Sequence, residues 1–322
     1  MEIKYNIPLS KISYYKIGGP AKYLLKINNK KDLIEAITFI KSNKISKILP
    51  MGLGAKLLIS DNGFDGAVLW FNSSSKNDEL ITKDENRLTA FASVELDNLI
   101  NFSLQHQLTG LEWAGGLPST IGAAIRGNIG CFGHDIKDIC LSAEILDLAD
   151  PELNIKIIKK EVLEFGYRTS IIKQIKTLIV VSASFSLVQS GLKDLMDARS
   201  TYERNIQYRN DNHPIEYPSC GSVFKNIIEK NEMEKIIKIW PDIQETVLNK
   251  WHNKVAMGYV IGRLGLGGRS QGGAEISLKH SNYIINKGGA TFHDVHSLIE
   301  LIQKKVIEIF GFTPDPEVQI IY

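Results

Sequence analysis

The sequence has few cysteines, no long hydrophobic run and almost no net charge. Its three cysteines, Cys131, Cys140 and Cys220, form no CxxC pair, so neither a disulfide framework nor a structural zinc site is expected. No segment reaches the ~18 consecutive apolar residues of a membrane span, and the start MEIKYNIPLS lacks the apolar core of a signal peptide. We therefore expect a cytoplasmic protein without membrane insertion, and no metal site.

The charge balance excludes another class of partner. The chain has 38 basic and 36 acidic side chains and a formal net charge of +2, whereas nucleic-acid-binding proteins show a clear basic surplus. Its 43% hydrophobic and 23% charged residues are typical of a globular protein. A length of 322 residues suggests about two domains. No nucleic-acid partner is expected, and a monomer is assumed.

Short strand-like runs alternate with a few helices along the chain. Thr291 is a suitable N-cap for the strongest helix, Asp294 follows at the third helical position, and Gly311 supplies its stop. Predicted strands cover residues 23–27, 48–51, 67–71, 175–187 and 314–322. Predicted helices cover residues 31–41, 192–208 and 229–240 and the segment between Thr291 and Gly311.

Two small-residue segments are candidates for phosphate binding. Residues 52–58 (GLGAKLL) follow a predicted strand, and their backbone N–H groups could face a phosphate. They form neither a Walker loop nor a Rossmann fingerprint, so an ordinary turn is an equal alternative. Residues 115–124 (GGLPSTIGAA) precede a predicted helix start that could bind an anion. The alternative is capping by Ser119 or Thr120 with no ligand.

A glycine-rich tract and a serine cluster also have two interpretations. Glycines recur through residues 110–133, with apolar residues between them, which favours a packed segment facing a ligand over a solvated loop. Residues 219–226 (SCGSVFKN) place Ser222 after a glycine and close to a lysine and an asparagine. The hydrolase pattern Gly-x-Ser-x-Gly is absent, and spacing alone favours a structural serine over a catalytic one at Ser222.

A resemblance changes this balance. IGGPAKYLLKI, MGLGAKLLISDNGFDGAVL, GLEWAGGLPSTIGAAIRGNIGCFG, FGYRTSIIK, PSCGSVFKN, GGAEISLKHSNYIINKGGAT and DPEVQIIY occur in this order. Together they resemble the UDP-N-acetylenolpyruvoylglucosamine reductase (MurB) family over nearly the whole chain. The uninterrupted stretch from Ser170 to Ser219 is similar to the compact second type of that family.

The resemblance implies an α+β fold. Its FAD-binding fold would be of the p-cresol methylhydroxylase and vanillyl-alcohol oxidase type, with subdomains at residues 1–66 and 67–200. A substrate-binding domain would follow at residues 201–312, and residues 313–322 would return to the active site as a strand. FAD would be held non-covalently and reduced by NADPH. Enolpyruvyl-UDP-N-acetylglucosamine would then be reduced to UDP-N-acetylmuramate, in peptidoglycan precursor synthesis.

The same resemblance assigns three catalytic residues. Ser222 takes the role of proton donor, and Arg168 binds the substrate carboxylate, which its guanidinium fork matches. Glu317 would lie near the same carboxylate and act in its protonated form, because two anions would repel each other. The alternatives are a capping serine, a surface arginine and a solvated glutamate. The assignment requires the three side chains to meet at one site.

The remaining predicted binding residues also follow from the matching motifs. The expected cofactor-binding residues are Gly52, Gly54, Ala55, Lys56, Leu57, Gly115, Gly116, Pro118, Ser119, Thr120, Gly122, Asn128 and Gly130. The expected substrate-binding residues are Tyr167, Lys225, Asn226, Lys279, His280 and Asn282.

The departures from the family lie on the cofactor side. Ala55-Lys56 stands where Ser-Asn is usual, Pro118-Ser119 replaces Pro-Gly, Gly122-Ala123 replaces a double glycine, and Tyr14-Tyr15 replaces Asn-Thr. They leave two rival interpretations. One is a flavin oxidase of a sugar or alcohol, for which His134 could be a covalent tether. The other is a non-catalytic UDP-sugar- or nucleotide-binding protein that has lost its flavin.

Overall fold

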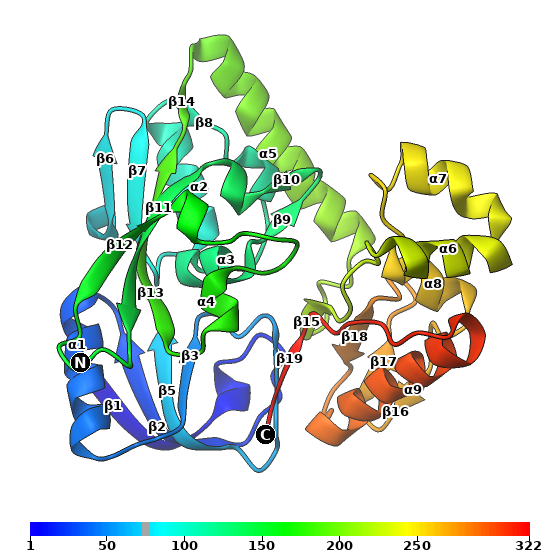
Figure 1. Ribbon diagram of the computed structural model, residues 1–322, viewed down its shortest axis with the longest axis horizontal. Helices are drawn as coiled ribbons and strands as arrows, with labels where there is room; N and C mark the ends of the chain where they lie inside the picture. The colour runs from blue at the N-terminus through cyan, green and yellow to red at the C-terminus, as the bar shows by residue number, and fades with distance from the viewer. Residues whose placement is uncertain (73–77) are drawn as a thin grey trace. The chain divides into compact units, whose positions relative to one another are not determined.

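The computed structural model describes residues 1–72 and 78–322, and helices and sheets are mixed along the chain (Figure 1). Contacts divide the chain into two compact units, each assembled from separate segments. The first unit contains residues 1–7, 21–53 and 65–209. The second contains residues 8–20, 54–64 and 210–322. These contact units are not the predicted domains, whose boundaries stay predictions.

One sheet of the first unit has the strand order β1-β2-β5-β3, in which β3 and β5 run parallel. Helix α1 (Lys30–Ser42) begins at Asn29, whose side chain accepts a hydrogen bond from the Asp32 backbone N–H. Its buried face includes Leu33, Ile37 and Ile40, which confirms the predicted helix. The strands are β1 (Glu2–Pro8), β2 (Pro20–Ile27), β3 (Ile48–Met51) and β5 (Phe64–Phe71).

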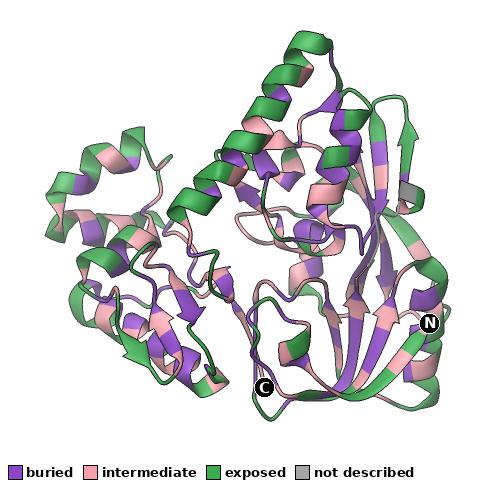
Figure 2. Cartoon of the chain, turned by 180° about the vertical axis from the view of Figure 1, so that it is seen from behind, coloured by how far each residue is buried: buried purple, intermediate pink, exposed green. Residues whose placement is uncertain are grey.

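A second, antiparallel sheet of this unit has the order β12-β11-β13-β7-β6. Its central strand β13 (Leu178–Ser186) is buried over most of its length, in agreement with the strand predicted at residues 175–187. Figure 2 shows buried residues along these strands. The other strands are β6 (Ile81–Asp84), β7 (Arg87–Phe91), β11 (Cys140–Asp147) and β12 (Ile155–Lys159).

Helices and short strands complete the first unit. Helix α3 packs against β13 and β7, so its ends are held by the buried sheet. The helices are α2 (Leu96–Gln105), α3 (Ile121–Gly127), α4 (Ile171–Gln174) and α5 (Leu192–Asn212), whose last residues belong to the second unit. The short strands are β8 (Leu108–Thr109), β9 (Gly130–Cys131), β10 (His134–Asp135) and β14 (Val188–Gln189). The 3-10 turns are η2 (Asp78–Leu80), η3 (Glu112–Ala114), η4 (Ile136–Asp138) and η5 (Lys160–Val162).

The second unit contains an antiparallel sheet of order β15-β18-β17-β16 with helices around it. Helix α9 packs against β17 and β16 and contributes Val295, Leu298 and Ile302 to the core. The strands are β15 (Ser219–Ser222), β16 (Ser270–Gln271), β17 (Ala274–Ile276) and β18 (Tyr283–Asn286). The helices are α6 (Lys230–Ile239), α7 (Gln244–Asn249), α8 (Met257–Arg263) and α9 (Phe292–Phe310), with 3-10 turns η1 (Leu9–Lys11) and η6 (Pro241–Ile243).

The ends of α9 follow the sequence prediction. Thr291 and Asp294 form a reciprocal capping box, in which each side chain accepts a hydrogen bond from the other residue's backbone N–H. Gly311 ends the helix in the left-handed conformation with φ of 70°. These backbone hydrogen bonds lower the pKa of Asp294. The predicted N-cap, third position and stop are all confirmed.

The closing strand is shorter than predicted. Only Gln319–Ile321 forms β19, which pairs in parallel with β4 (Leu57–Ile59). The residues before β19 contact a different segment, because Phe224 and Pro316 form an isolated bridge and Lys225 N–H donates to the Asp315 carbonyl at 3.0 Å. Residues 54–64 and the C-terminal segment are thus joined within one unit.

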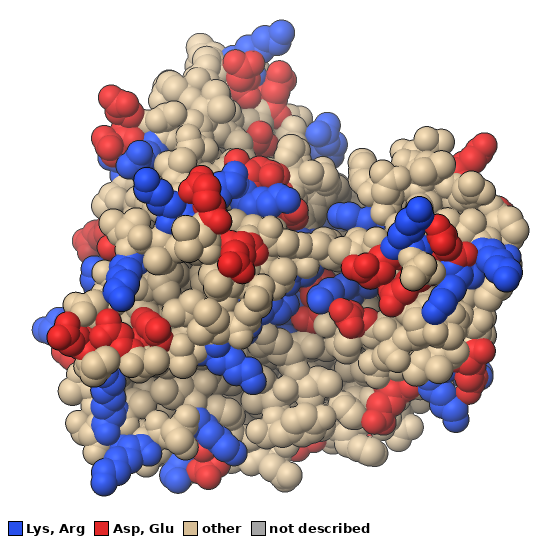
Figure 3. Space-filling model, viewed as in Figure 1, with Lys and Arg blue, Asp and Glu red and all other residues tan. Residues whose placement is uncertain are grey.

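Two surface properties complete the description. In the part of the chain that the structure describes, every helix is too short or too polar to cross a bilayer. Basic and acidic side chains are mixed over the face seen in Figure 3, in line with the formal net charge of +2.

Candidate active site

Ser222 ends strand β15 in the second unit, at an irregular position of the sheet. It lies opposite Tyr283 of β18, and the pairing register shifts between Ser219 and Ser222. Gly221, with φ of 70°, supplies the backbone conformation that an L side chain rarely adopts. Beyond the shift, Val223 N–H donates to the Asn282 carbonyl at 2.8 Å. The glycine and the shifted register together set the direction of the Ser222 backbone.

Glu317 is held next to this strand by main-chain hydrogen bonds. Its N–H donates to the Val223 carbonyl at 2.7 Å, and the Val318 N–H donates to the same oxygen at 3.2 Å. The Glu317 side chain is 15% exposed. Two of the three predicted catalytic residues, Ser222 and Glu317, are therefore brought together inside one unit by backbone pairing.

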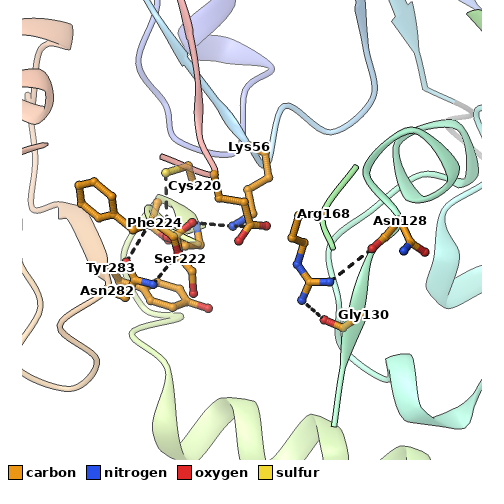
Figure 4. Close-up of polar contacts among 12 residues, drawn as sticks. Lys56, Asn128, Gly130, Arg168, Cys220, Ser222, Phe224, Asn282 and Tyr283 are labelled. Carbon is orange, nitrogen blue, oxygen red and sulfur yellow. Dashed lines mark hydrogen bonds and ion pairs between the residues drawn. The ribbon is translucent and has the colours of Figure 1, made fainter. Parts of the chain in front are cut away.

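Lys56 connects the two. Its Nζ donates to the Ser222 carbonyl at 2.6 Å (Figure 4). The same Nζ lies 3.2 Å from Glu317 Oε1. Its own carbonyl accepts from the Gln319 N–H at 2.9 Å, next to the β4–β19 pair. Lys56 therefore places a positive charge beside the Glu317 carboxylate.

Two predicted substrate-binding asparagines have structural contacts. Asn282 is buried, and its amide exchanges two hydrogen bonds of 2.9 Å with the backbone of Phe224. Asn226 Oδ1 accepts from the Met257 N–H at 3.2 Å. Both contacts fix the strand that follows Ser222, so these residues shape the site through the backbone. Direct substrate contact by either one stays a prediction.

His280 belongs to an aromatic cluster that the sequence did not reveal. The His280 ring lies 5.3 Å from His213 and 4.8 Å from Tyr283, and the Tyr283 hydroxyl is 3.2 Å from His213 Nδ1. Burial lowers the pKa of His280, with a smaller contribution from the positive charge of Lys56. The cluster therefore presents a neutral imidazole in the same unit as Ser222.

The two predicted substrate-binding lysines have weaker partners. Lys225 Nζ lies 3.4 Å from Asp315 Oδ2, an exposed carboxylate. Lys279 Nζ donates to the Asn210 carbonyl at 2.8 Å and lies 3.9 Å from Glu216. Exposed pairs of this kind are worth little in stability, so both ammonium groups could exchange these partners for a ligand phosphate.

Arg168 belongs to the first unit and has a well-defined surrounding there. One guanidinium nitrogen, NH1, lies 3.3 Å from the Asn128 carbonyl and 3.4 Å from Asp135 Oδ1, and NH2 donates to the Gly130 carbonyl (Figure 4). The residue has φ of 55°, an unfavourable conformation for a non-glycine residue. The predicted substrate-binding residue Tyr167 lies with its ring centroid 5.2 Å from the guanidinium carbon.

Asn128 and Gly130 were predicted to bind the cofactor, and in the structure their carbonyl groups contact the Arg168 guanidinium. Asn128 ends α3 in the left-handed conformation, is fully buried, and donates from Nδ2 to the Gly166 carbonyl at 2.8 Å. Gly130 has no room for a side chain, because a Cβ there would overlap Asp135. Cofactor binding by these two residues stays a prediction.

Two predicted cofactor segments meet in the first unit. A Cβ on Gly52 would overlap the Thr120 hydroxyl, so the turn after β3 touches the start of α3. Gly115 and Gly116 face the other way, because Cβ atoms there would meet Tyr202 and Arg209 of α5. The Arg209 Nε also donates to the Gly115 carbonyl at 2.9 Å. Cofactor binding by all of these residues stays a prediction.

Capping of α3 by Ser119 or Thr120 was one of two interpretations and is wrong, whereas anion binding at this helix start stays a prediction. Within the described residues, Ser119 and Thr120 make no side-chain cap, and the Ser119 hydroxyl donates to the Thr120 carbonyl at 3.0 Å. The Ile121 and Gly122 N–H groups donate to the Val94 and Ala92 carbonyls at 2.9 and 3.0 Å. These two N–H groups are therefore not donors for a phosphate. The sequence could not show this, because residues 92 and 94 are far from the helix start.

The remaining predicted cofactor-binding residues lie at two turns. Gly54 has φ of 67° and Leu57 begins β4, with Ala55 between them in the second unit. Pro118 is exposed, and Gly122 approaches Ala92, whose Cβ would lie 3.0 Å from an added Cβ. Across residues 1–72 and 78–322, His, Cys, Asp and Glu form no group suited to hold a metal ion.

Sequence reasoning missed two residues and one contact. Asp135 faces Arg168, Tyr283 lies opposite Ser222, and Lys56, which was predicted to bind the cofactor, also pairs with Glu317. Tyr283 could have been found, because it follows Asn282 in the motif GGAEISLKHSNYII. The other two contacts join residues distant in sequence and left no local pattern.

The comparisons with known proteins agree with the sequence resemblance. A family model for the C-terminal domain of UDP-N-acetylenolpyruvoylglucosamine reductase matches residues 213–321, and one for an FAD-binding domain matches residues 21–153. The UDP-N-acetylenolpyruvoylglucosamine reductase of Caldanaerobacter subterraneus subsp. tengcongensis is 35% identical, over 98% of this chain and 92% of the relative. That of Lactobacillus johnsonii is 34% identical, over 100% and 95%.

A solved structure extends the similarity to three dimensions. The crystal structure of UDP-N-acetylenolpyruvylglucosamine reductase (MurB) from Thermus caldophilus matches with a TM-score of 0.74 and covers 100% of both chains. Its sequence identity is 23%, so this match concerns the fold. The predicted α+β fold with an FAD-binding part is confirmed.

Proposed function

Because the chain belongs to the UDP-N-acetylenolpyruvoylglucosamine reductase family, we propose that it reduces enolpyruvyl-UDP-N-acetylglucosamine to UDP-N-acetylmuramate with electrons from NADPH. The family and the FAD-binding domain make it an FAD-dependent oxidoreductase. The proposal places it in peptidoglycan precursor synthesis, in the cytoplasm and as a monomer. One observation carries the residue assignment, namely that Lys56 holds the backbone of Ser222 and the carboxylate of Glu317 together.

The residues predicted to hold the flavin nucleotide are mostly small, so they leave room for it and contribute little charge. The turn from Gly52 to Leu57 has small residues and a positive φ at Gly54, which lets a backbone approach a ligand closely. Thr120 has a hydroxyl that does not cap α3 within the described residues. We propose that Gly52, Gly54, Ala55, Leu57 and Thr120 hold FAD non-covalently. These residues would hold FAD, which would supply two-electron transfer from NADPH to the substrate alkene.

Ser222 is the proposed proton donor to the carbon next to the substrate carboxylate. A correctly positioned general acid typically accelerates a reaction by a factor of 10²–10⁴. The alcohol is a weak acid, so its position matters more than its intrinsic acidity. The shifted register, Gly221 and the paired Asn282 amide fix the strand on which it sits.

Arg168 is the proposed partner of the substrate carboxylate and of the negative charge that develops on it. A guanidinium keeps its charge and matches a planar carboxylate with two parallel N–H groups. The contacts to Asn128, Gly130 and Asp135 hold the guanidinium plane before substrate arrives. Lys225, Lys279 and His280 are proposed for the UDP-sugar.

The decisive experiment adds enolpyruvyl-UDP-N-acetylglucosamine to FAD-loaded protein and follows NADPH oxidation and product formation. Wild type should oxidise NADPH beyond the stoichiometric amount that reduces its flavin only when substrate is added. Ser222→Ala should still allow NADPH to bleach the flavin absorbance but should form no product. Ser270→Ala, an exposed serine of the same sheet, is the control. Protein that neither contains nor takes up FAD would instead favour a nucleotide-binding protein without flavin.

A further inference from the structure

Lys56 connects three distant parts of the second unit at one ammonium group. It lies in the turn before β4, its Nζ donates to the carbonyl at the end of β15, and its ion pair reaches Glu317 just before β19. Its carbonyl also accepts from Gln319. Figure 4 shows the lysine side chain directed at the Ser222 backbone.

The backbone at Gly221 allows the Lys56 side chain to approach closely. Gly221 has no side chain, and a Cβ placed there would lie 3.4 Å from Lys56 Nζ. The Glu317 side chain is 15% exposed and the Lys56 side chain is 40% exposed, so the carboxylate is the more buried partner of the pair. Solvent therefore screens the pair on the side of the ammonium group more than on the side of the carboxylate.

The chemistry of the partners indicates what the ammonium does. The Ser222 carbonyl and the Glu317 carboxylate are both acceptors, so they repel each other unless a donor stands between them. Lys56 offers three N–H donors and a positive charge. Removing Lys56 Nζ would take away the donor and the positive charge that both acceptors share. The main-chain hydrogen bonds from Glu317 and Val318 to the Val223 carbonyl would still join the two segments, so the change would fall on the direction of the Glu317 side chain and on the Ser222 carbonyl.

We propose that Lys56 is a positioning residue, which fixes the Ser222 backbone and the Glu317 carboxylate relative to one another for protonation of the substrate. This inference rests on the function proposed above. It differs from the cofactor-binding role predicted for Lys56, in which the ammonium would contact the FAD diphosphate. A cofactor-binding role predicts a loss of FAD affinity when Lys56 is replaced, and no energetic coupling between Lys56 and Glu317. A positioning role predicts an unchanged FAD affinity and energetic coupling between the two residues.

The test uses FAD-loaded, full-length protein with Lys56→Met, Lys56→Arg, Glu317→Gln and the double variant Lys56→Met/Glu317→Gln. The rate at which substrate reoxidises the NADPH-reduced protein should fall about 10- to 100-fold in Lys56→Met, because small displacements at a reaction centre have effects of that size. The double variant should be no slower than the slower single variant, because the two residues act as one unit. Lys56→Arg should recover most of the rate.

Two further readouts separate positioning from cofactor binding. The dissociation constant of FAD should stay within about twofold of wild type in Lys56→Met, since an uncharged tip would weaken a diphosphate contact much more. Urea unfolding of the same variants without substrate should show coupling between Lys56→Met and Glu317→Gln. This second readout does not depend on the reaction.

Lys287 and Glu275 supply a matched control, because they form a 3.0 Å ion pair in the same unit with 48% and 17% exposed side chains. Lys287→Met and Glu275→Gln should leave reoxidation by substrate unchanged. Additive rates and independent unfolding effects of Lys56→Met and Glu317→Gln would overturn the proposal, as would a large loss of FAD affinity in Lys56→Met alone. Wild type that binds FAD, reacts with NADPH and ignores the substrate would instead contradict the proposed function itself.

Discussion

The side chain of Asn282 pairs with the backbone of Phe224 as a neighbouring strand would. Its Oδ1 accepts from the Phe224 N–H and its Nδ2 donates to the Phe224 carbonyl, both at 2.9 Å. Asn282 is 3% exposed and Phe224 is 1% exposed, so water has little access to these groups. The strand that carries Ser222 is thus extended by an amide where the regular sheet register has already ended.

We expect Asn282→Ala to destabilise the protein by roughly 2–4 kcal/mol, because it leaves two buried backbone groups unsatisfied. Urea denaturation would measure this loss. Asn62→Ala, an exposed asparagine of the same unit, should change the free energy of unfolding by less than about 0.5 kcal/mol. Equal stability of the two variants would show that the Phe224 groups find other partners.

Arg168 holds a backbone conformation that glycine would adopt more easily. At φ of 55°, a left-handed L residue carries a cost of roughly 1 kcal/mol. Arg168→Gly should therefore be more stable than Arg168→Ala by about 1 kcal/mol, while both variants lose turnover. Thermal unfolding and the NADPH assay would measure the two effects.

Arg126 provides the matched comparison for this prediction. It lies inside α3 with helical geometry, so Arg126→Gly should be less stable than Arg126→Ala by roughly 0.5–1 kcal/mol. The order of the glycine and alanine variants should thus reverse between the two arginines. The same order at both positions would mean that the Arg168 backbone relaxes once its side chain is removed.

Local signals in the sequence predicted helix α9 well. Thr291, Asp294 and Gly311 occupy the N-cap, the third position and the left-handed stop, because caps are set by residues within one turn of each other. Strand β13 was also identified from its run of β-branched and apolar residues. Both elements depend on short-range patterns that can be identified directly in the sequence.

The candidate site was predictable as a set of motifs but not as a set of contacts. The resemblance pointed to Ser222 and Glu317, which the β15–β19 region brings together. The pairing of Lys56 with Glu317 spans most of the chain, and the occupation of the α3 N–H groups by Ala92 and Val94 is set by a neighbouring segment. Tertiary packing determines these contacts, so no local sequence pattern predicts them.

His280 gives the second unit a pH dependence of known sign. Burial lowers its pKa in the folded protein, whereas an unfolded histidine has a pKa of about 6.5. Below that value the unfolded chain binds the extra proton, so stability should fall as the pH drops from about 6.5 towards the lower folded value. His280→Gln should show a smaller loss of unfolding free energy between pH 7 and pH 5 than wild type.

The surroundings of His280 define the controls for this measurement. Its ring lies near His213 and Tyr283, and the charge of Lys56 acts in the same direction as burial. His252→Gln, at an exposed histidine of the same unit, is the matched control variant. A pH profile of His280→Gln that coincides with wild type would assign the acid sensitivity to other groups.

The contact between Gly52 and Thr120 should limit what residue 52 can be. A Cβ on Gly52 would overlap the Thr120 hydroxyl and lie 3.0 Å from its Cγ2, so Gly52→Ala should cost about 1–3 kcal/mol through overpacking and weaken FAD binding. Thr120→Ala in the same chain removes both atoms and should restore part of the stability, measured by urea unfolding alongside FAD titration. Gly127→Ala is the control, because a Cβ there meets Ile129 at an ordinary 3.7 Å. If the double variant is no more stable than Gly52→Ala, the strain does not come from Thr120 and the turn after β3 must be constrained by another neighbour.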